Sequence, residues 1–351
     1  MIRGHGSAVF SVGWSPNGKY LVTGGTDTNI KIWDVAAKRE PELPVKIVEY
    51  LTSAFTSGNE LLAVGIAPEG QATVLNVSTA QQVANLNETA GELLCAVFSP
   101  DKKLLATGGT GGSIQLWNVA TGELERALNG HNSYVYGIAF SPDGRLLVSG
   151  DKEGTLIMWN VATGAEVNRL RNGIDNSWRT AFSPDGQYLA SAVDGGLVQL
   201  WDVASQRVVR TLKGHSETVR AIAFSPDGKW VVTAGDDSSV RLWDIATGHQ
   251  IRKLGLADHV ERALFSPDGK RLVTGSVDGT VKLWDMNTNQ ELITLKGHAD
   301  EVTSITFSSD GRALATTGLD GTLRLWRAAT KREVGSTSVT SDLVPTYPEK
   351  P

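Results

Sequence analysis

Histidine, serine or threonine, and aspartate recur together in this chain, and side chains of these three types can form a hydrolytic triad. His215, Thr233 and Asp237 are one such set, and Trp243 follows them. A nucleophile must be exposed and aimed at a substrate, whereas these hydroxyls fall in apolar, strand-like runs. Catalysis also needs one site, not four copies. We therefore interpret the sets as structural: hydroxyl, imidazole and carboxylate satisfy one another's hydrogen bonds in a buried chain.

Other residues that could do chemistry lack the required spacing. The histidines show neither His-x-x-x-His nor Cys/His metal spacing; they are His5, His131, His215, His249, His259 and His298. The glycine-rich run 108–112 has no following helix and no Gly-Lys-Ser/Thr, so a phosphate loop is not supported. We expect no metal and no cofactor.

Composition narrows the partners and the compartment. The 351 residues carry 33 Lys+Arg against 38 Asp+Glu, a formal net charge of −5, which argues against sequence-independent nucleic-acid binding. No run approaches about 18 apolar residues, so no membrane span is expected. The N-terminus has no signal-like apolar stretch, and the single cysteine, Cys95, cannot form an internal disulfide. We expect a cytoplasmic protein.

A repeat organises the chain. Seven tryptophans, each closing a short alternating apolar run, are separated by 84, 42, 42, 42, 41 and 42 residues: Trp33, Trp117, Trp159, Trp201, Trp243, Trp284 and Trp326. Leu75 lies at the midpoint of the longest gap, which gives eight units. An aromatic landmark lies 19 or 20 residues earlier in each unit, usually followed by Ser-Pro-Asp-Gly, a turn sequence between two strands. The pattern predicts four short antiparallel strands per unit.

These landmarks closely resemble those of the WD-repeat propeller family, over residues 4 to about 337. The resemblance implies an all-β fold, a single propeller of eight four-stranded antiparallel blades, with seven blades plus one degenerate unit as the alternative. It also implies a buried structural tetrad in several blades. The full sets are His5, Thr23, Asp27 and Trp33; His215, Thr233, Asp237 and Trp243; and His298, Thr316, Asp320 and Trp326. A fourth set has His131, Ser149 and Trp159, with Glu153 in place of the aspartate, and the unit at residues 35–76 has none.

The register of the repeats also predicts the domain boundaries. Residues 1–337 form the propeller, and 338–351, rich in proline, form a disordered tail. Residues 36–48 should supply the outer strand of the first blade. Residues 1–3 match only the tail of an outer strand, so we expect 333–337 to complete the last blade. Because the chain starts within a motif, a longer parent with an upstream effector domain is a further hypothesis.

The resemblance finally places two residues per blade at the mouth of the central channel. The first set is Phe10, Leu51, Leu94, Tyr136, Trp178, Arg220, Glu261 and Thr303; the second is Thr26, Pro68, Thr110, Lys152, Asp194, Asp236, Val277 and Leu319. The first set is apolar and aromatic in blades one to five. We predict a partner-binding site at Phe10, Leu94, Tyr136 and Trp178, with Arg220 or Lys152 pairing an acidic residue of the partner. The alternative is that these side chains merely plug the channel, or that Trp178 turns into the core.

The expected function is a non-enzymatic scaffold that binds a protein or peptide at the propeller face and channel mouth. Two alternatives remain open. One is a sensor or regulatory propeller within a larger multidomain protein. The other is an enzyme centred in the channel, which would need convergent acids, bases or metal ligands that the mapped residues scarcely provide.

Overall fold

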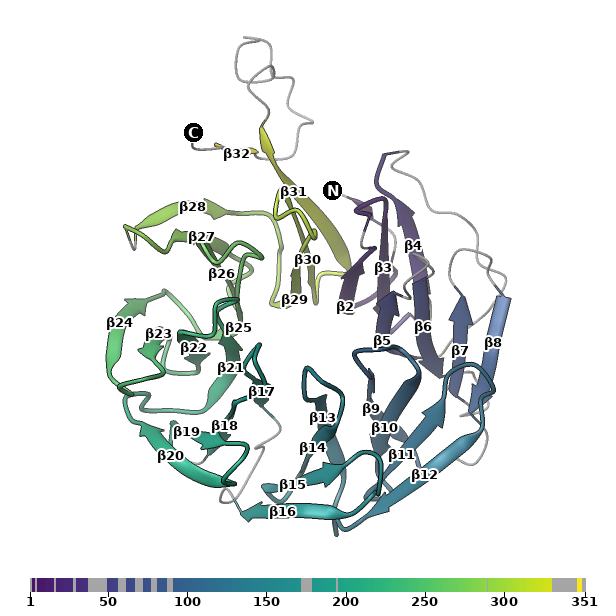
Figure 1. The fold of residues 1–351 in the computed structure, drawn as a ribbon. Coiled ribbons are helices and arrows are strands. Elements are labelled where there is room, and N and C mark those ends of the chain that lie inside the picture. The colour runs from purple at the N-terminus through teal and green to yellow at the C-terminus, as the bar shows by residue number, and fades with distance from the viewer. Residues whose placement is uncertain are drawn as a thin grey trace.

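The computed structural model describes residues 2–3, 5–15, 17–27, 30–36, 49–55, 61–66, 72–76, 81–86, 91–171, 179–193, 195–288, 290–329 and 346–348. Within these ranges all regular structure is β, arranged as eight sheets around a centre (Figure 1). No helix in this part of the chain could cross a membrane. The predicted all-β propeller is confirmed.

In each blade, the consecutive strands run side by side from the centre of the ring outward. The first four sheets are β2 (Val9–Trp14), β3 (Tyr20–Gly25) and β4 (Ile30–Asp34); β5 (Glu49–Phe55), β6 (Leu61–Ile66), β7 (Ala72–Asn76) and β8 (Gln81–Leu86); β9 (Leu93–Phe98), β10 (Leu104–Gly109), β11 (Ser113–Asn118) and β12 (Leu124–Asn129); and β13 (Val135–Phe140), β14 (Leu146–Asp151), β15 (Thr155–Asn160) and β16 (Glu166–Arg171). The next three are β17 (Thr180–Phe182), β18 (Tyr188–Val193), β19 (Leu197–Asp202) and β20 (Arg207–Leu212); β21 (Val219–Phe224), β22 (Trp230–Gly235), β23 (Ser239–Asp244) and β24 (Gln250–Gly255); and β25 (Val260–Phe265), β26 (Arg271–Ser276), β27 (Val281–Asp285) and β28 (Glu291–Leu295). The eighth combines β29 (Val302–Phe307), β30 (Ala313–Gly318) and β31 (Thr322–Ala329) with β1 (Ile2–Arg3) and β32 (Thr346–Pro348).

The predicted Ser-Pro-Asp-Gly turns join the first two strands of the fourth, fifth, sixth and seventh blades. In the sixth blade the Ser225 hydroxyl donates to Asp227 Oδ1 at 2.7 Å and accepts from the backbone N–H of Trp230 at 2.9 Å. Gly228 adopts a φ of 70°, a left-handed conformation that glycine accepts without steric cost. The turn residues therefore satisfy their own polar groups while the chain reverses.

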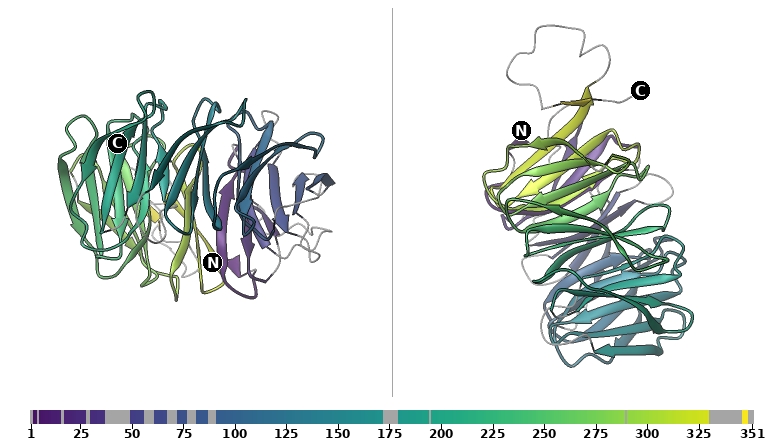
Figure 2. Two further views of the ribbon diagram at one scale, coloured as in Figure 1. Left: turned by 90° about the horizontal axis from the view of Figure 1, so that it is seen from below. Right: turned by 90° about the vertical axis from the view of Figure 1, so that its left-hand side faces the viewer.

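The core lies between the faces of neighbouring blades, which stand side by side around the ring (Figure 2). One apolar cluster joins Val273 and Leu283 of the seventh blade to Val302, Leu314 and Trp326 of the eighth. Burying these faces stabilises each blade against the next, by about 25 cal/mol for each Å² of apolar surface removed from water. No blade buries both of its faces alone, so the ring depends on every interface.

The ring of innermost strands closes. Each inner strand contacts the next, from β2 through β5, β9, β13, β17, β21 and β25 to β29 and back to β2. In the outer layer, β1 pairs antiparallel with β31, with Ile2 opposite Leu323 and Arg3 opposite Thr322. Ile2 and Arg3 thus pair at the outer edge of the eighth blade, at the place that their register predicted.

Three further expectations meet the structure only in part. The β5–β8 sheet is the degenerate unit of the seven-plus-one alternative, and β5 contacts both β2 and β9. The expected outer strands at 36–48 and 333–337 fall outside the described residues, apart from Ala36. The boundary at 337 and the disorder of the tail stay predictions, although Thr346–Pro348 within that tail pair parallel with Arg327–Ala329 of β31.

Candidate interaction site at the channel mouth

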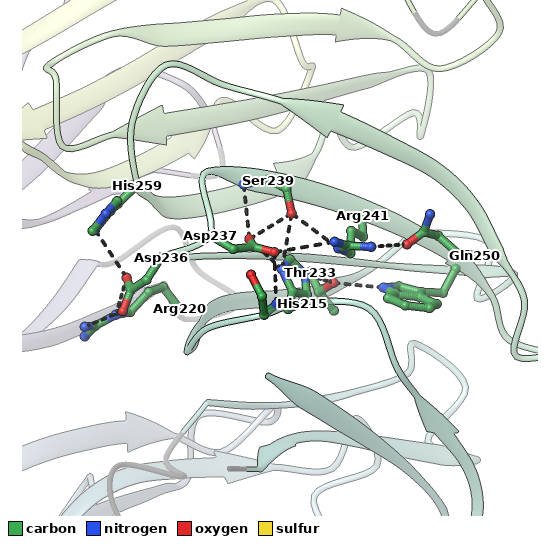
Figure 3. A network of polar contacts seen from close by, with 11 residues as sticks. His215, Arg220, Thr233, Asp236, Asp237, Ser239, Arg241, Gln250 and His259 are labelled. Carbon is green, nitrogen blue, oxygen red and sulfur yellow. Dashed lines mark hydrogen bonds and ion pairs between the residues drawn. The ribbon is translucent and has the colours of Figure 1, made fainter. Parts of the chain in front are cut away.

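The sixth blade shows how a tetrad is built. His215 joins Asp237 Oδ1 through Nδ1 and Thr233 Oγ1 through Nε2, each at 2.8 Å, and the Trp243 indole N–H donates to the same hydroxyl at 2.8 Å (Figure 3). Burial lowers the pKa of His215, against the opposing hydrogen bond and charge of Asp237. Burial also opposes ionisation of Asp237, but hydrogen bonds from His215 and Ser239 outweigh it and lower its pKa to about 2. Thr233 is fully buried, so its hydroxyl cannot reach a substrate, and the set holds the blade together.

The first and last blades repeat this arrangement. The histidines His5 and His298 contact Asp27 at 2.7 Å and Asp320 at 3.1 Å through Nδ1. Each accompanying threonine meets its histidine Nε2 at 2.8 Å and accepts the tryptophan N–H at 2.9 Å; the pairs are Thr23 with Trp33 and Thr316 with Trp326. Both tetrads come together as the resemblance implied.

The fourth blade corrects the sequence interpretation. His131 reaches Ser149 through Nε2 at 2.7 Å, and Trp159 donates to that hydroxyl at 2.8 Å. Its Nδ1 lies 2.9 Å from Asp151 Oδ2, so the set does not lack an aspartate and Glu153 does not take that role. Asp151 ends β14, two residues earlier than expected, and its carboxylate replaces the one usually supplied by the turn.

The backbone explains how Asp151 can do this. In the eighth blade the same strand position is Gly318, opposite Val302 as Asp151 is opposite Val135. A Cβ built on Gly318 would lie 2.8 Å from His298 Nδ1. A side chain at this position therefore points directly at the histidine, and a glycine is needed where the turn aspartate is used.

The first set of predicted mouth residues has a common structural origin. In the sixth blade Val219 pairs with Gly235 and Ala221 with Ala234, which leaves Arg220 as the extra residue of a β-bulge. The same bulge occurs in six other inner strands, at Phe10, Leu51, Leu94, Tyr136, Glu261 and Thr303. A bulge re-aims one side chain relative to its neighbours. Trp178 lies outside the described residues.

The second set is brought to the same corner of each blade by a backbone hydrogen bond. The backbone N–H of each second-set residue donates to the carbonyl of the residue that lies two places before the bulge in the same blade, over 2.8–3.0 Å. The donor and acceptor pairs are Thr26 and Ala8, Thr110 and Glu92, Lys152 and Tyr134, Asp236 and Thr218, Val277 and His259, and Leu319 and Glu301. Sequence reasoning missed these acceptors, which the hydrogen bonds hold beside the second set. In blades with a tetrad, each acceptor lies three residues after the histidine. Pro68 and Asp194 lie outside the described residues.

The apolar part of the mouth is exposed at two aromatic side chains. Phe10 is 50 % exposed and Tyr134 is 43 % exposed, while Leu94 and Tyr136 are partly buried. The rings of Tyr134 and Tyr136 lie 6.5 Å apart between centroids, and Lys152 Nζ lies 5.7 Å from the Tyr134 ring. The fourth blade thus presents two tyrosines and a lysine, a combination suited to an apolar side chain beside an acidic one.

The charged part of the mouth is joined by contacts within the chain. The Arg220 Nε–H is shared between the two carboxylate oxygens of Asp236, at 2.9 and 3.1 Å, and Nη2 donates to the same carboxylate at 2.9 Å (Figure 3). This hydrogen bonding raises the pKa of Arg220. Glu261 and His259 lie within 3.9 and 3.7 Å of this pair. Arg220 thus has a carboxylate partner within the chain, whereas Lys152 is exposed beside the Tyr134 ring.

Thr303 serves closure instead of the mouth. It is buried, and its hydroxyl donates to the carbonyl of Val9 on the first blade. It also lies 3.2 Å from the hydroxyl of Thr317. This side chain therefore joins the eighth blade to the first at the inner strands.

Comparisons with known proteins agree with this geometry. The family described as "WD domain, G-beta repeat" matches residues 1–34, 171–202, 206–244, 247–285 and 289–327, and the family described as "IFT140 first beta-propeller" matches 44–171. A crystal structure of the computationally designed Ika8 protein aligns with a TM-score of 0.81 at 28 % identity, covering 93 % of this chain and 98 % of that one. The ribosome biogenesis protein BOP1 homolog of Aedes aegypti is 33 % identical over 99 residues. The match covers 28 % of this chain and 10 % of that relative. The repeats, the tetrads and a family match over more than half of its residues together show that the chain belongs to the WD-repeat family.

Proposed function

We propose that this protein is a non-enzymatic, cytoplasmic scaffold that binds a peptide or partner domain at the channel mouth. WD-repeat propellers generally bind protein partners. The observation that supports this site is the exposure of Phe10 and Tyr134 at the mouth. Exposed aromatic side chains that gather on one surface are typical of binding sites, where tyrosine and tryptophan are common anchors.

The partner segment is proposed to carry an apolar side chain that inserts beside Tyr136, with Trp178 of the next blade on its other side. Lys152 is exposed beside Tyr134 and would pair an acidic residue of the partner. Arg220 would contact the partner segment without forming an ion pair with it, because its guanidinium is already hydrogen-bonded to Asp236. The proposal thus favours a segment that is mainly apolar with one acidic neighbour.

The test compares mouth variants with a rim variant. A partner is first captured from source lysate with the wild-type protein and identified. The purified partner is then titrated with the wild-type protein and with each variant. Tyr136→Ala and Trp178→Ala should each weaken binding by about 2 kcal/mol or more while leaving the melting temperature nearly unchanged. Ile251→Ala, on the exposed outer strand β24, should leave binding unchanged. If the mouth variants bind normally, or unfold, the side chains are a plug and the proposal fails.

A further inference from the structure

A groove lies between the third and fourth blades, which are neighbours in the ring (Figure 1). Its volume is about 440 Å³, within the range of roughly 300–1,000 Å³ that is usual for ligand pockets. Leu104, Leu116 and Val161 form its apolar lining. Tyr136 of the channel mouth lies at the start of β13, whereas the groove residue Arg145 follows the turn at the end of that strand. The groove and the mouth are therefore at opposite ends of the strands.

The corresponding junction between the sixth and seventh blades is almost closed. Leu242 and Met286 occupy there the positions that Leu116 and Val161 have in the groove, as the pairing of the strands and the turn hydrogen bonds show. The cavity that they line has a volume of only about 10 Å³. The same place in the repeat is thus filled at one junction and open at another.

The first residue of the second strand differs between these junctions. Its side chain packs toward the next blade in each case: Leu104 joins the apolar cluster of the third and fourth blades, Tyr188 that of the fifth and sixth, and Trp230 that of the sixth and seventh. Leucine fills less space than tyrosine or tryptophan, and protein interiors are otherwise closely packed. The protein itself therefore places an aromatic ring where the groove has a leucine.

The groove residues carry a net positive charge. Arg126 donates to two backbone carbonyls of the fourth blade at 2.9 and 3.0 Å, and in the described part of the chain it forms no ion pair. Arg145 is exposed, and its Nε lies 3.9 Å from an exposed Asp143 oxygen, a pair that contributes little in water. Glu125 is the acidic residue of the lining, and its Oε1 accepts from the Asn118 amide at 2.8 Å. The two arginines therefore favour a negatively charged ligand.

We propose that this groove is a second binding site, which takes a segment of a partner protein that inserts an aromatic side chain beside an acidic residue. The ring packs against Leu104, Leu116 and Val161, and the acidic residue pairs with Arg126 or Arg145. Aromatic side chains bury about 150–250 Å² each, and tyrosine and tryptophan are common anchors of interfaces. Because the groove lies away from the channel mouth, this inference does not depend on the proposed function.

The test uses indole-3-acetate, which combines an indole ring with a carboxylate. The methyl resonances of Leu116 and Val161 in the full chain are followed by NMR while this compound is added, and we expect saturable shifts of both. Indole-3-ethanol, which lacks the charge, should bind about two- to fivefold more weakly. Absence of saturable shifts would overturn the inference, and equal affinity for the two compounds would overturn its acidic part.

Variants make the result specific to the groove. Leu104→Trp should fill the groove with the chain's own ring and abolish the saturable shifts. Leu104→Tyr does the same if the tryptophan variant fails to fold, since Tyr188 has this strand position in the fifth blade. Ile251→Trp, on the exposed outer strand β24, is the control and should bind as wild type does. Unchanged binding in the Leu104 variants would overturn the site.

The channel mouth is tested separately. Tyr136→Ala should leave the shifts of Leu116 and Val161 unchanged, because Tyr136 lies at the other end of β13. If Tyr136→Ala abolishes them, the compound acts from the mouth and the groove is not the site. A protein that binds its partner at the mouth but shows no shifts in the groove would keep the proposed function and lose this inference.

Discussion

The sixth and seventh blades are neighbours with the same four strands, but they are held differently. In both, a tryptophan donates to a buried threonine: Trp243 to Thr233 at 2.8 Å and Trp284 to Thr274 at 3.2 Å. The sixth blade adds His215, which connects that threonine to a carboxylate. The seventh has Leu256 in its place, 41 residues later, packed against an apolar cluster. A blade can therefore exchange a polar link for apolar packing and keep its fold.

The exchange leaves a trace in the seventh blade. Ser276 pairs with Val260 at the strand position that Asp151 holds in the fourth blade, where the side chain faces the histidine. In the seventh blade no histidine is there to meet it. The Ser276 hydroxyl is buried and, within the described part of the chain, has no hydrogen-bond partner. Such an orphaned polar group is destabilising, so the apolar solution is incomplete.

The largest effect should come from removing the histidine. His215→Ala leaves the buried Asp237 carboxylate without its main partner and opens a cavity, so we expect a loss of about 3 kcal/mol of unfolding free energy. Chemical denaturation measures it, with the exposed His249→Ala as the neutral control. Partner binding should persist. If His215→Ala loses no more unfolding free energy than Leu256→Ala, the polar link of the sixth blade is worth no more than the apolar packing of the seventh.

The fourth blade tests which carboxylate completes a tetrad. Asp151→Ala should lower the unfolding free energy by about 2 kcal/mol, because His131 loses a hydrogen bond at 2.9 Å between buried groups. Glu153→Ala should change it little, since Glu153 is exposed. The same denaturation experiment distinguishes them, and the opposite ranking would restore the interpretation from sequence.

Acidification should destabilise the blades that contain a buried histidine before those that lack one. Burial lowers the pKa of His131, His215 and His298, against the attraction of their aspartates. The unfolded chain therefore takes up protons first as the pH falls below about 6.5, the ordinary histidine value, and stability is lost in that range. Each histidine contributes up to about 1.4 kcal/mol per pH unit. Amide exchange at pH 7.5 and 5.5 should show weakened protection in the fourth, sixth and eighth blades before the seventh; uniform loss would contradict this account.

The smallest effect concerns the orphaned hydroxyl. Ser276→Ala removes it without changing the backbone, so we expect a gain of up to about 1 kcal/mol. Ser239→Ala is the matched control in the sixth blade, because that hydroxyl donates to Asp237 at 2.8 Å, and it should destabilise. Thermal melts of the two variants should move in opposite directions. If Ser276→Ala melts lower than wild type, its hydroxyl has a partner.

The repeated landmarks made the fold readable from sequence, because each tryptophan fixes the register of its own blade. The positions of Arg220 and Tyr136 at bulges also follow from that register. Asp151 could not be found in the same way, because a strand side chain replaces a turn side chain and only the backbone shows that both reach one nitrogen.

Other parts of the site depend on contacts between segments far apart in sequence. Thr303 has the spacing of a mouth residue, but closure brings it against Val9 of the first blade. The pairing of Arg220 with Asp236 depends on side-chain geometry within the blade. Spacing predicts which residues share a corner, and the structure is needed to show which of them remain available to a partner.

The two-residue strand β1 has a consequence for assembly. It holds the first blade to the last as an intramolecular association, so its strength depends on the effective concentration of the two ends and not on protein concentration. When this seam opens, β1 of one molecule can pair with β31 of another, which is domain swapping. The fraction of swapped molecules rises with protein concentration, whereas closure of a single ring does not depend on it. Dilution therefore favours the monomeric ring.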